Sequence, residues 1–310
     1  MMKISVVVPA YNEEDYLPAC LTSLKKQDFK GDFEIIVVDN NSTDKTSQIA
    51  KQAGVKVVFE PKRGTGSARQ AGAVASLGEI IAYTDADTIV PENWLSTIAT
   101  EFEEDKNLAA FGGLYNLSSG PFLIRMGFLS SIRAFNCLDK FLSNGWNLAG
   151  TNFAVRKTCF LKTGGFNISL QINEEHDISQ RIKEFGTVKL DSYFLVKTSG
   201  RGFKYGLISW ILRYGPATFS RVFLKRNNFN KLKPIRKESR VSQIILEPLL
   251  IVSVVLLVFI SSPSVYAKAQ ERIAFVHKKI DSADYQIKKE SHKLKVAVAS
   301  KVENLRYRQR

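Results

Sequence analysis

The segment EIIAYTDAD, residues 79–87, runs from a strand pattern straight into two carboxylates. Ile80–Tyr83 is apolar or small throughout, which is typical of a strand covered on both faces. Asp85 and Asp87 follow at once. Residues two apart in an extended chain face the same side, so both carboxylates are expected to point to one place. Packed like charges need a positive group, and a divalent cation is expected to supply it.

The strand pattern recurs through the first hundred residues and alternates with helical patterns. Strands covered on both faces and separated by helices predict an α/β, Rossmann-like, mostly parallel sheet flanked by helices. The elements expected first are strands at 3–8, 33–39 and 55–60 and helices at 13–27, 44–53 and 65–76. Later elements of a domain over residues 1–225 are helices at 121–142 and 174–186, a strand at 147–155 and an amphipathic stretch at 203–224.

Polar residues follow the expected strands, at the sheet edge where such folds bind ligands. Asp39, Asp85 and Asp87 are therefore expected at one edge. Mg²⁺ or Mn²⁺ takes oxygen ligands and shares them with phosphate, so a metal–diphosphate complex is the predicted occupant. The basic loop 61–72 lacks the GxxxxGK[ST] pattern. Its Arg63 and Arg69 either hold the diphosphate or are solvated.

The charge distribution predicts a partner with an anionic surface. The net charge is +14, and residues 268–310 hold twelve Lys/Arg against five Asp/Glu. Such a basic end fits membrane lipid, nucleic acid or an acidic partner, or it is a solvated helix. We predict a membrane partner and no nucleic acid. Three cysteines without a CxxC pattern favour a reducing compartment over disulfides or zinc.

The most hydrophobic stretch, residues 244–260, predicts a membrane anchor. With residues up to 267 it reaches the roughly 20 residues that a span needs. A buried core helix or a re-entrant hairpin is the alternative. Seven Lys/Arg in 225–240 against four in 261–280 favour a cytoplasmic N-terminal domain in a single-pass cell-membrane protein. The divisions are a basic linker at 226–243, a transmembrane helix at 244–267 and a basic amphipathic tail at 268–310, which lies on the membrane or self-associates.

Six short motifs in order resemble family 2 glycosyltransferases of the GT-A fold over roughly residues 1–200. They are VVVPAYNEE at 6–14, IIVVDNNSTDKT at 35–46, KRGTGSARQAG at 62–72, YTDAD at 83–87, LAGTNFAVRK at 148–157 and EEHDISQRI at 174–182. The resemblance implies metal-dependent transfer of a sugar from a nucleotide-diphosphate donor, with inversion at the anomeric carbon. The QxxRW pattern of processive synthases is missing, so one sugar is expected to reach a lipid-linked or glycan acceptor.

The same resemblance assigns roles to individual residues. Glu175 falls on the position of the catalytic base, with Glu174 and Asp177 as rivals. Asp85 and Asp87 match the metal-binding pair, and Asp85 also faces the substrate. The remaining expected substrate contacts are Pro9, Tyr11, Glu13 and Asp39 around the nucleoside, Arg63 and Arg69 near the donor, and Trp146 and Asn152 on the acceptor side. Two other functions fit the same residues: a nucleotidyltransferase and a non-catalytic nucleotide-sugar-binding membrane scaffold.

Overall fold

A computed structural model describes residues 2–203, apart from 121, 144, 171 and 172. The predicted linker 226–243, transmembrane segment 244–267 and tail 268–310 lie outside the described residues, as does the amphipathic stretch from residue 204 onward. Within the described part, no helix combines the length and apolarity that a membrane span needs.

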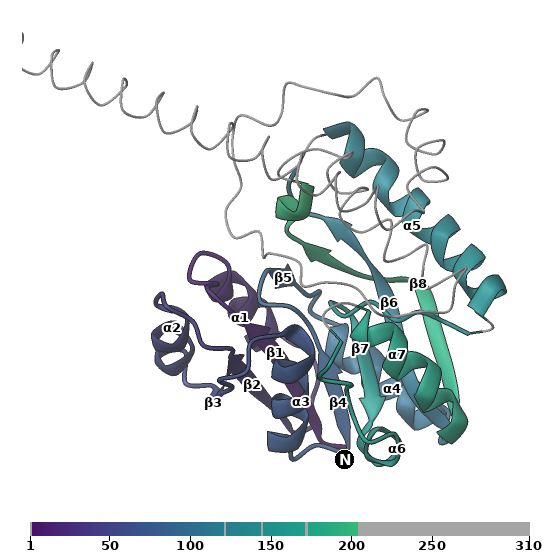
Figure 1. The fold of residues 1–310 in the computed structure, drawn as a ribbon, viewed down its shortest axis with the longest axis horizontal. Coiled ribbons are helices and arrows are strands. Elements are labelled where there is room, and N and C mark those ends of the chain that lie inside the picture. Colours follow the sequence, from purple (N-terminus) through teal and green to yellow (C-terminus); the bar gives the residue numbers. More distant parts are fainter. Residues whose placement is uncertain (1, 121, 144, 171–172, 204–310) are drawn as a thin grey trace, which may run out of the picture. The chain divides into compact units, whose positions relative to one another are not determined.

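The described chain is built on one eight-stranded mixed sheet in the order β3-β2-β1-β4-β7-β6-β8-β5 (Figure 1). The first four strands are mutually parallel, as predicted. β7 runs antiparallel to both of its neighbours, β4 and β6, which makes the sheet mixed. The strands are β1 (Ile4–Ala10), β2 (Phe33–Asp39), β3 (Lys56–Phe59), β4 (Ile80–Tyr83), β5 (Thr88–Ile89), β6 (Leu108–Leu117), β7 (Phe153–Arg156) and β8 (Thr187–Thr198).

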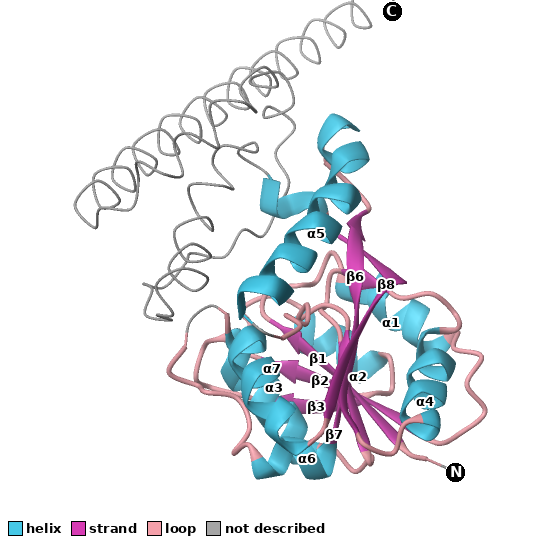
Figure 2. Ribbon diagram, turned by 90° about the vertical axis from the view of Figure 1, so that its right-hand side faces the viewer, coloured by secondary structure: helices cyan, strands magenta, loops and turns pink. Residues whose placement is uncertain are grey.

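Helices cover both faces of the sheet, as Figure 2 shows edge-on. One face carries α1 (Leu17–Lys25), α2 (Thr46–Gln52) and α4 (Trp94–Glu104). The other carries α3 (Thr65–Ala75), α6 (Lys157–Lys162) and α7 (Glu174–Ile182). The long helix α5 (Phe122–Ser143) lies against β6, and short 3-10 turns occupy Lys183–Phe185 and Gly200–Phe203.

The two cores explain the apolar strand pattern. Val6 and Val8 of β1 pack into the core under α1, while Val7 between them packs into the core under α3. Successive residues of a strand point to opposite faces, so a strand between two helical layers needs apolar residues at every position. Gly72 brings α3 close to β1, because a Cβ atom on Gly72 would meet Val7 Cγ1 at 2.3 Å.

Two local predictions differ from the structure. The expected strand at 147–155 begins only at Phe153, and the residues before it form a loop that packs onto the sheet edge. The segment after β4 is not extended either. The backbone N–H of Thr88 donates to the carbonyl of Asp85 at 3.0 Å, which closes a tight turn. The period-two argument for Asp85 and Asp87 is therefore wrong.

Candidate active site

Arg69 joins three carboxylates at the edge of the sheet. Its Nη2 donates to Asp85 Oδ1 at 2.9 Å, and its Nη1 donates to Glu174 Oε1 at 3.1 Å and to Glu175 Oε1 at 2.6 Å. The Arg69 side chain is only 2% exposed. Burial alone would lower the pKa of Arg69, but the three carboxylates raise it above its ordinary value, so the guanidinium stays charged. Arg69 was predicted to approach the donor, and the structure adds that it holds the three acids together.

A second arginine, Arg201, neutralises the other aspartate of the turn. Arg201 Nη2 lies 2.9 Å from Asp87 Oδ2, and the guanidinium also grips Glu13 with two hydrogen bonds of 2.6 and 2.7 Å. Burial raises the pKa values of Asp85 and Asp87, and the arginines oppose that shift. The positive groups that balance the aspartates are thus side chains of the protein, whereas the sequence argument assigned that part to a metal ion.

Sequence reasoning missed Arg201 and misplaced Glu13. Arg201 follows the last strand and lies 188 residues from Glu13, so no local pattern joins them. The sequence offers only an arginine three residues after the end of β8, in a segment for which no strand was predicted. Glu13 was expected to contact the nucleoside, but its buried carboxylate is occupied by Arg201.

The three acids at the start of α7 have different surroundings. Glu174 is 5% exposed, and burial followed by the neighbouring Glu175 carboxylate raises the pKa of Glu174 to about 8. Glu175 keeps 23% of its side chain exposed. Asp177 pairs with Arg181, which also donates to the carbonyls of Thr163 and Gly165. The carboxylate of Asp177 therefore lies in a structural ion pair and not in the Arg69 cluster, so its predicted catalytic role is not supported.

The loop before β7 packs directly onto the Arg69 cluster. A Cβ atom on Gly150 would lie 2.1 Å from Glu175 Oε1 and 2.3 Å from Arg69 Nη2. Trp146, predicted to contact the acceptor, is half-buried and has Lys140 Nζ 4.0 Å from its ring centre. The loop thus brings a glycine backbone, rather than a side chain, against the acids.

Asn152 was predicted to contact substrate, and the structure places it in the core. It is 0% exposed. Its Oδ1 accepts from Trp94 Nε1 at 2.8 Å, and its Nδ2 donates to the carbonyls of Leu114 and Phe194, both at 2.9 Å. This amide ties β6, β8 and α4 to the start of β7, so the prediction of substrate contact is wrong.

The expected nucleoside contacts lie at the ends of β1 and β2. Pro9 belongs to β1, and Ala10 pairs with Asp39 across the parallel ladder. Asp39 Oδ1 accepts a hydrogen bond from the backbone of Ser42 at 2.9 Å. Arg63 is exposed and its guanidinium lies 4.2 Å from the ring centre of Tyr11. Tyr11, Asp39 and Arg63 thus share the edge predicted for the nucleotide.

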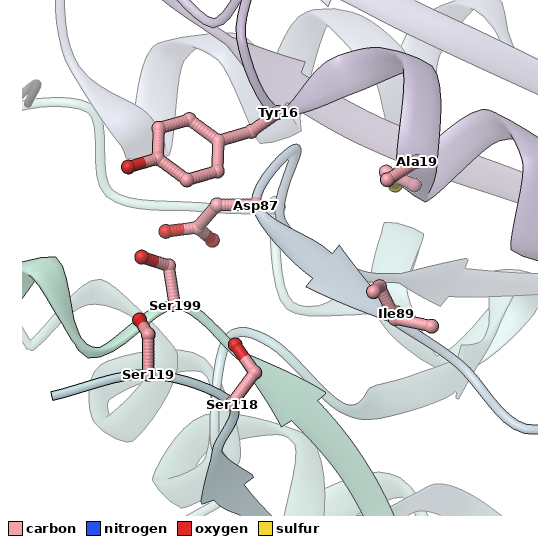
Figure 3. Close-up of a pocket in the computed structure, with 8 residues that line it drawn as sticks. Tyr16, Ala19, Asp87, Ile89, Ser118, Ser119 and Ser199 are labelled. Carbon is pink, nitrogen blue, oxygen red and sulfur yellow. The ribbon is translucent and has the colours of Figure 1, made fainter.

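A pocket of about 240 Å³ opens beside Asp87 (Figure 3). Figure 3 shows the Asp87 carboxylate between the hydroxyl groups of Tyr16 and Ser199, with Ser118 and Ser119 below. Burial raises the pKa of the Cys20 thiol at its wall, so this sulfur stays protonated. The remaining lining residues are Ala19 and Ile89.

The acidic turn suits a divalent cation only as part of a larger ligand set. Asp85 and Asp87 lie on a single turn. Both offer carboxylate oxygens, the kind of ligand that Mg²⁺ and Mn²⁺ take. Among the described residues, no group of three or more His, Cys, Asp or Glu side chains gathers closely enough to hold an ion. Magnesium sites commonly use one or two carboxylates together with substrate phosphates. The residues therefore fit a cation that arrives with a diphosphate.

The family model for glycosyl transferase family 2 matches residues 5–164, just over half of the chain. The chain belongs to glycosyl transferase family 2. The predicted family and the α/β GT-A-type fold are confirmed, because a mannosyltransferase of Pyrobaculum calidifontis has the same fold. That structure has a TM-score of 0.55 and 20% identity, over 88% of this chain and 79% of that one, and was determined with GDP-Man and Mn²⁺.

Other relatives agree with the family. An uncharacterized glycosyltransferase of Mycobacterium tuberculosis is 38% identical over 105 residues, 34% of this chain and 46% of that protein. The poly(ribitol-phosphate) β-N-acetylglucosaminyltransferase TarS of Staphylococcus aureus is 37% identical over 111 residues, 34% of this chain and 19% of TarS. The match thus spans less than half the length of these curated relatives. Glucosyl-3-phosphoglycerate synthase of M. tuberculosis, solved with Mn²⁺, UDP-glucose and phosphoglyceric acid, has a TM-score of 0.53 and 19% identity over 76% of this chain and 90% of that one.

Proposed function

We propose that this member of the family transfers one sugar from a nucleoside-diphosphate donor to an acceptor hydroxyl, with inversion, and that Glu175 is the general base. One observation carries the proposal: a single buried guanidinium, Arg69, bonds both Glu175 and Asp85. Arg69 thereby holds Glu175, the proposed proton acceptor, at a fixed place beside Asp85, which is proposed to face the donor diphosphate. Fixed placement of reacting groups is a large part of enzymatic rate enhancement.

In the proposed reaction the acceptor oxygen attacks the anomeric carbon on the face opposite the leaving nucleoside diphosphate. The new carbon–oxygen bond forms as the bond to the diphosphate oxygen breaks, and the acceptor proton passes to the Glu175 carboxylate. Arg69 orients Glu175 through the 2.6 Å hydrogen bond, so that its carboxylate stays at one place beside the acidic turn.

Glu175 is favoured over its two neighbours by its surroundings. Glu174 is more deeply buried, and its pKa of about 8 keeps it largely protonated at neutral pH. Asp177 is engaged with Arg181. Glu175 combines partial exposure with a strong cationic partner, which supports its role as the residue that touches the acceptor.

Asp85 and Asp87 would hold a divalent cation, Mg²⁺ or Mn²⁺, together with the donor diphosphate. Such an ion neutralises charge on the leaving phosphate when it is bound. Structural neighbours carry Mn²⁺ with GDP-Man or with UDP-glucose, which supports both the metal and a UDP- or GDP-sugar as donor. Tyr11, Asp39 and Arg63 are the proposed contacts to the nucleoside end, with Pro9 shaping the strand end beneath them.

The acceptor is proposed to be lipid-linked or a glycan at the cell membrane. The support is the hydrophobic segment 244–267 followed by the basic tail 268–310, which fits a single-pass anchor with the catalytic domain in the cytoplasm. The tail also offers an apolar stripe for self-association. Fractionation of the full chain between membranes and cytosol tests the location. Recovery in the cytosol in the absence of detergent would contradict it.

The test of the proposed activity has two stages. Thermal-shift screening of UDP-, GDP- and dTDP-sugars with and without Mn²⁺ identifies the donor by ligand-dependent stabilisation. Transfer with that donor is then measured for Glu175→Gln and Asp177→Asn. Loss of about 100-fold or more in kcat is expected for Glu175→Gln, as for removal of a general base, and little loss for Asp177→Asn in the folded fraction. Equal losses would contradict Glu175 as the base, and NMR of the product anomer tests inversion.

Binding without turnover is the outcome that favours the scaffold. If a donor stabilises the protein and no acceptor or water molecule ever receives the sugar, the transfer proposal fails. Release of pyrophosphate from a nucleoside triphosphate and a sugar phosphate would instead favour the nucleotidyltransferase.

A further inference from the structure

Arg201 lies beside Asp87, one of the two aspartates proposed above to hold the metal ion. Its guanidinium is bonded by three carboxylate oxygens, two from Glu13 and one from Asp87. The ring of Tyr16 lies against the same group, 4.7 Å from Arg201 Cζ to the ring centre. The Arg201 side chain is only 13% exposed. This is a built cation site whose occupant belongs to the chain.

Backbone hydrogen bonds fix the segment that carries Arg201. The N–H of Ser199 donates to the carbonyl of Asp87 at 3.2 Å, and the N–H of Gly200 donates to Ser119 Oγ at 3.0 Å. The N–H of Arg201 itself donates to Ser199 Oγ at 3.2 Å. These hydrogen bonds hold the backbone of Arg201 next to the acidic turn, and from there its guanidinium contacts Asp87.

Both carboxylate oxygens of Asp87 have partners. Oδ2 contacts Arg201, and Oδ1 accepts from Thr198 Oγ1 at 3.2 Å. A divalent cation in contact with Oδ2 would meet the guanidinium at the same oxygen, and two cations this close repel strongly at low dielectric. Arg201 and a metal ion on Asp87 Oδ2 are therefore alternatives.

We propose that Arg201 competes with the divalent cation for Asp87. In the absence of the sugar donor, Arg201 binds Asp87 and Glu13. A divalent cation can bind Asp87 only when the guanidinium of Arg201 moves away. Free Mn²⁺ consequently binds weakly, and the ion enters together with the diphosphate, whose negative charge compensates both cations. The proposal rests on the proposed function only in taking Asp87 as a metal ligand.

The experiment measures Mn²⁺ binding to the full chain without any donor, from the electron paramagnetic resonance signal of free Mn²⁺. Arg201→Gln is expected to bind Mn²⁺ at least about tenfold more tightly than the wild type, a difference of about 1.4 kcal/mol in binding free energy. Arg63→Gln is the matched control, because it removes the same charge from an exposed position that contacts Tyr11 and not Asp87. Its affinity is expected to stay within about twofold of the wild type, as surface charges are screened.

Two further variants complete the test. Arg201→Lys keeps the charge but loses the two-pronged grip on Glu13, so it is expected to show a smaller gain, and it serves if Arg201→Gln does not fold. Adding Asp87→Asn to Arg201→Gln should abolish the gain. Equal Mn²⁺ affinity in the wild type, Arg201→Gln and Arg201→Lys would overturn the proposal, as would a gain equal to that of Arg63→Gln. If the variants show no gain in Mn²⁺ affinity but the protein transfers sugar, the competition proposal fails and the proposed function stands. If the variants show the gain but no sugar is transferred, the competition proposal stands and the proposed function fails.

Discussion

Gly150 lies so close to Glu175 that a Cβ atom on residue 150 would meet Glu175 Oε1 at 2.1 Å. The same Cβ would lie 2.3 Å from Arg69 Nη2. Any side chain at this position must push the proposed base and its arginine partner from their places. The absence of a side chain on Gly150 is thus part of the geometry of the acid cluster.

Gly150→Ala is therefore expected to lower both activity and stability. A displacement of about 1 Å at a reacting group can cost about 100-fold in rate, which is about 2.7 kcal/mol, and overpacking typically costs about 1–3 kcal/mol of stability. Steady-state transfer assays and urea unfolding measure the two effects. Gly127→Ala is the control, because nothing lies within 4 Å of a Cβ there. Unchanged kcat in Gly150→Ala would contradict the fixed placement of Glu175 on which the proposal depends.

Arg69→Leu is expected to be among the most destabilising single changes. It leaves Asp85 and Glu175 without their common cation and Glu174 without its hydrogen-bond donor, and breaking a buried ion pair by removing one partner costs about 3–5 kcal/mol. The free energy of unfolding from urea titrations measures this cost. Arg63→Leu, at an exposed position, should change it by no more than about 0.5 kcal/mol. Similar values for the two variants would argue against the Arg69 cluster.

Glu174 is expected to make stability fall as pH rises. Its pKa is about 8 in the folded protein and near 4.5 when unfolded, so between these values the folded state binds more protons than the unfolded state. The free energy of unfolding then decreases with pH, by at most about 1.4 kcal/mol per unit for one such group. Glu174→Gln should remove this slope between pH 5 and 8 in matched urea titrations. Parallel pH profiles for the variant and the wild type would contradict the raised pKa.

Asn152→Ala tests a structural role against a role in substrate binding. The change leaves Trp94 Nε1 and the carbonyls of Leu114 and Phe194 without their partner, and each such buried group costs about 1–3 kcal/mol. Stability is expected to fall while KM for donor and acceptor stays unchanged in the folded fraction. A raised KM at wild-type stability would restore the acceptor-side prediction.

The sequence predicted the parallel half of the sheet well because its signal is local. Runs such as Ile80–Tyr83 are apolar at every position, and the helices between them are bounded by turn residues. Asp85 and Asp87 were predicted as site residues because they follow such a strand, and Glu175 was predicted because the resemblance to the family points to the acids that begin α7. What failed depended on distant pairing. Arg201 meets Glu13 across 188 residues, and the core position of Asn152 depends on how β7 enters the sheet.

The antiparallel entry of β7 also determines where Gly150 lies against the acids. Four residues, Phe153–Arg156, form the ladder with β4 that aligns Phe153 with Tyr83. A slip of one residue would carry Gly150 about 3.3 Å along the strand and turn each β7 side chain to the opposite core. The position of Gly150 beside the Arg69 cluster is thus secured by a ladder of only four residue pairs. Insertions or deletions in the chain just before Phe153 should therefore lower catalytic activity before they unfold the domain.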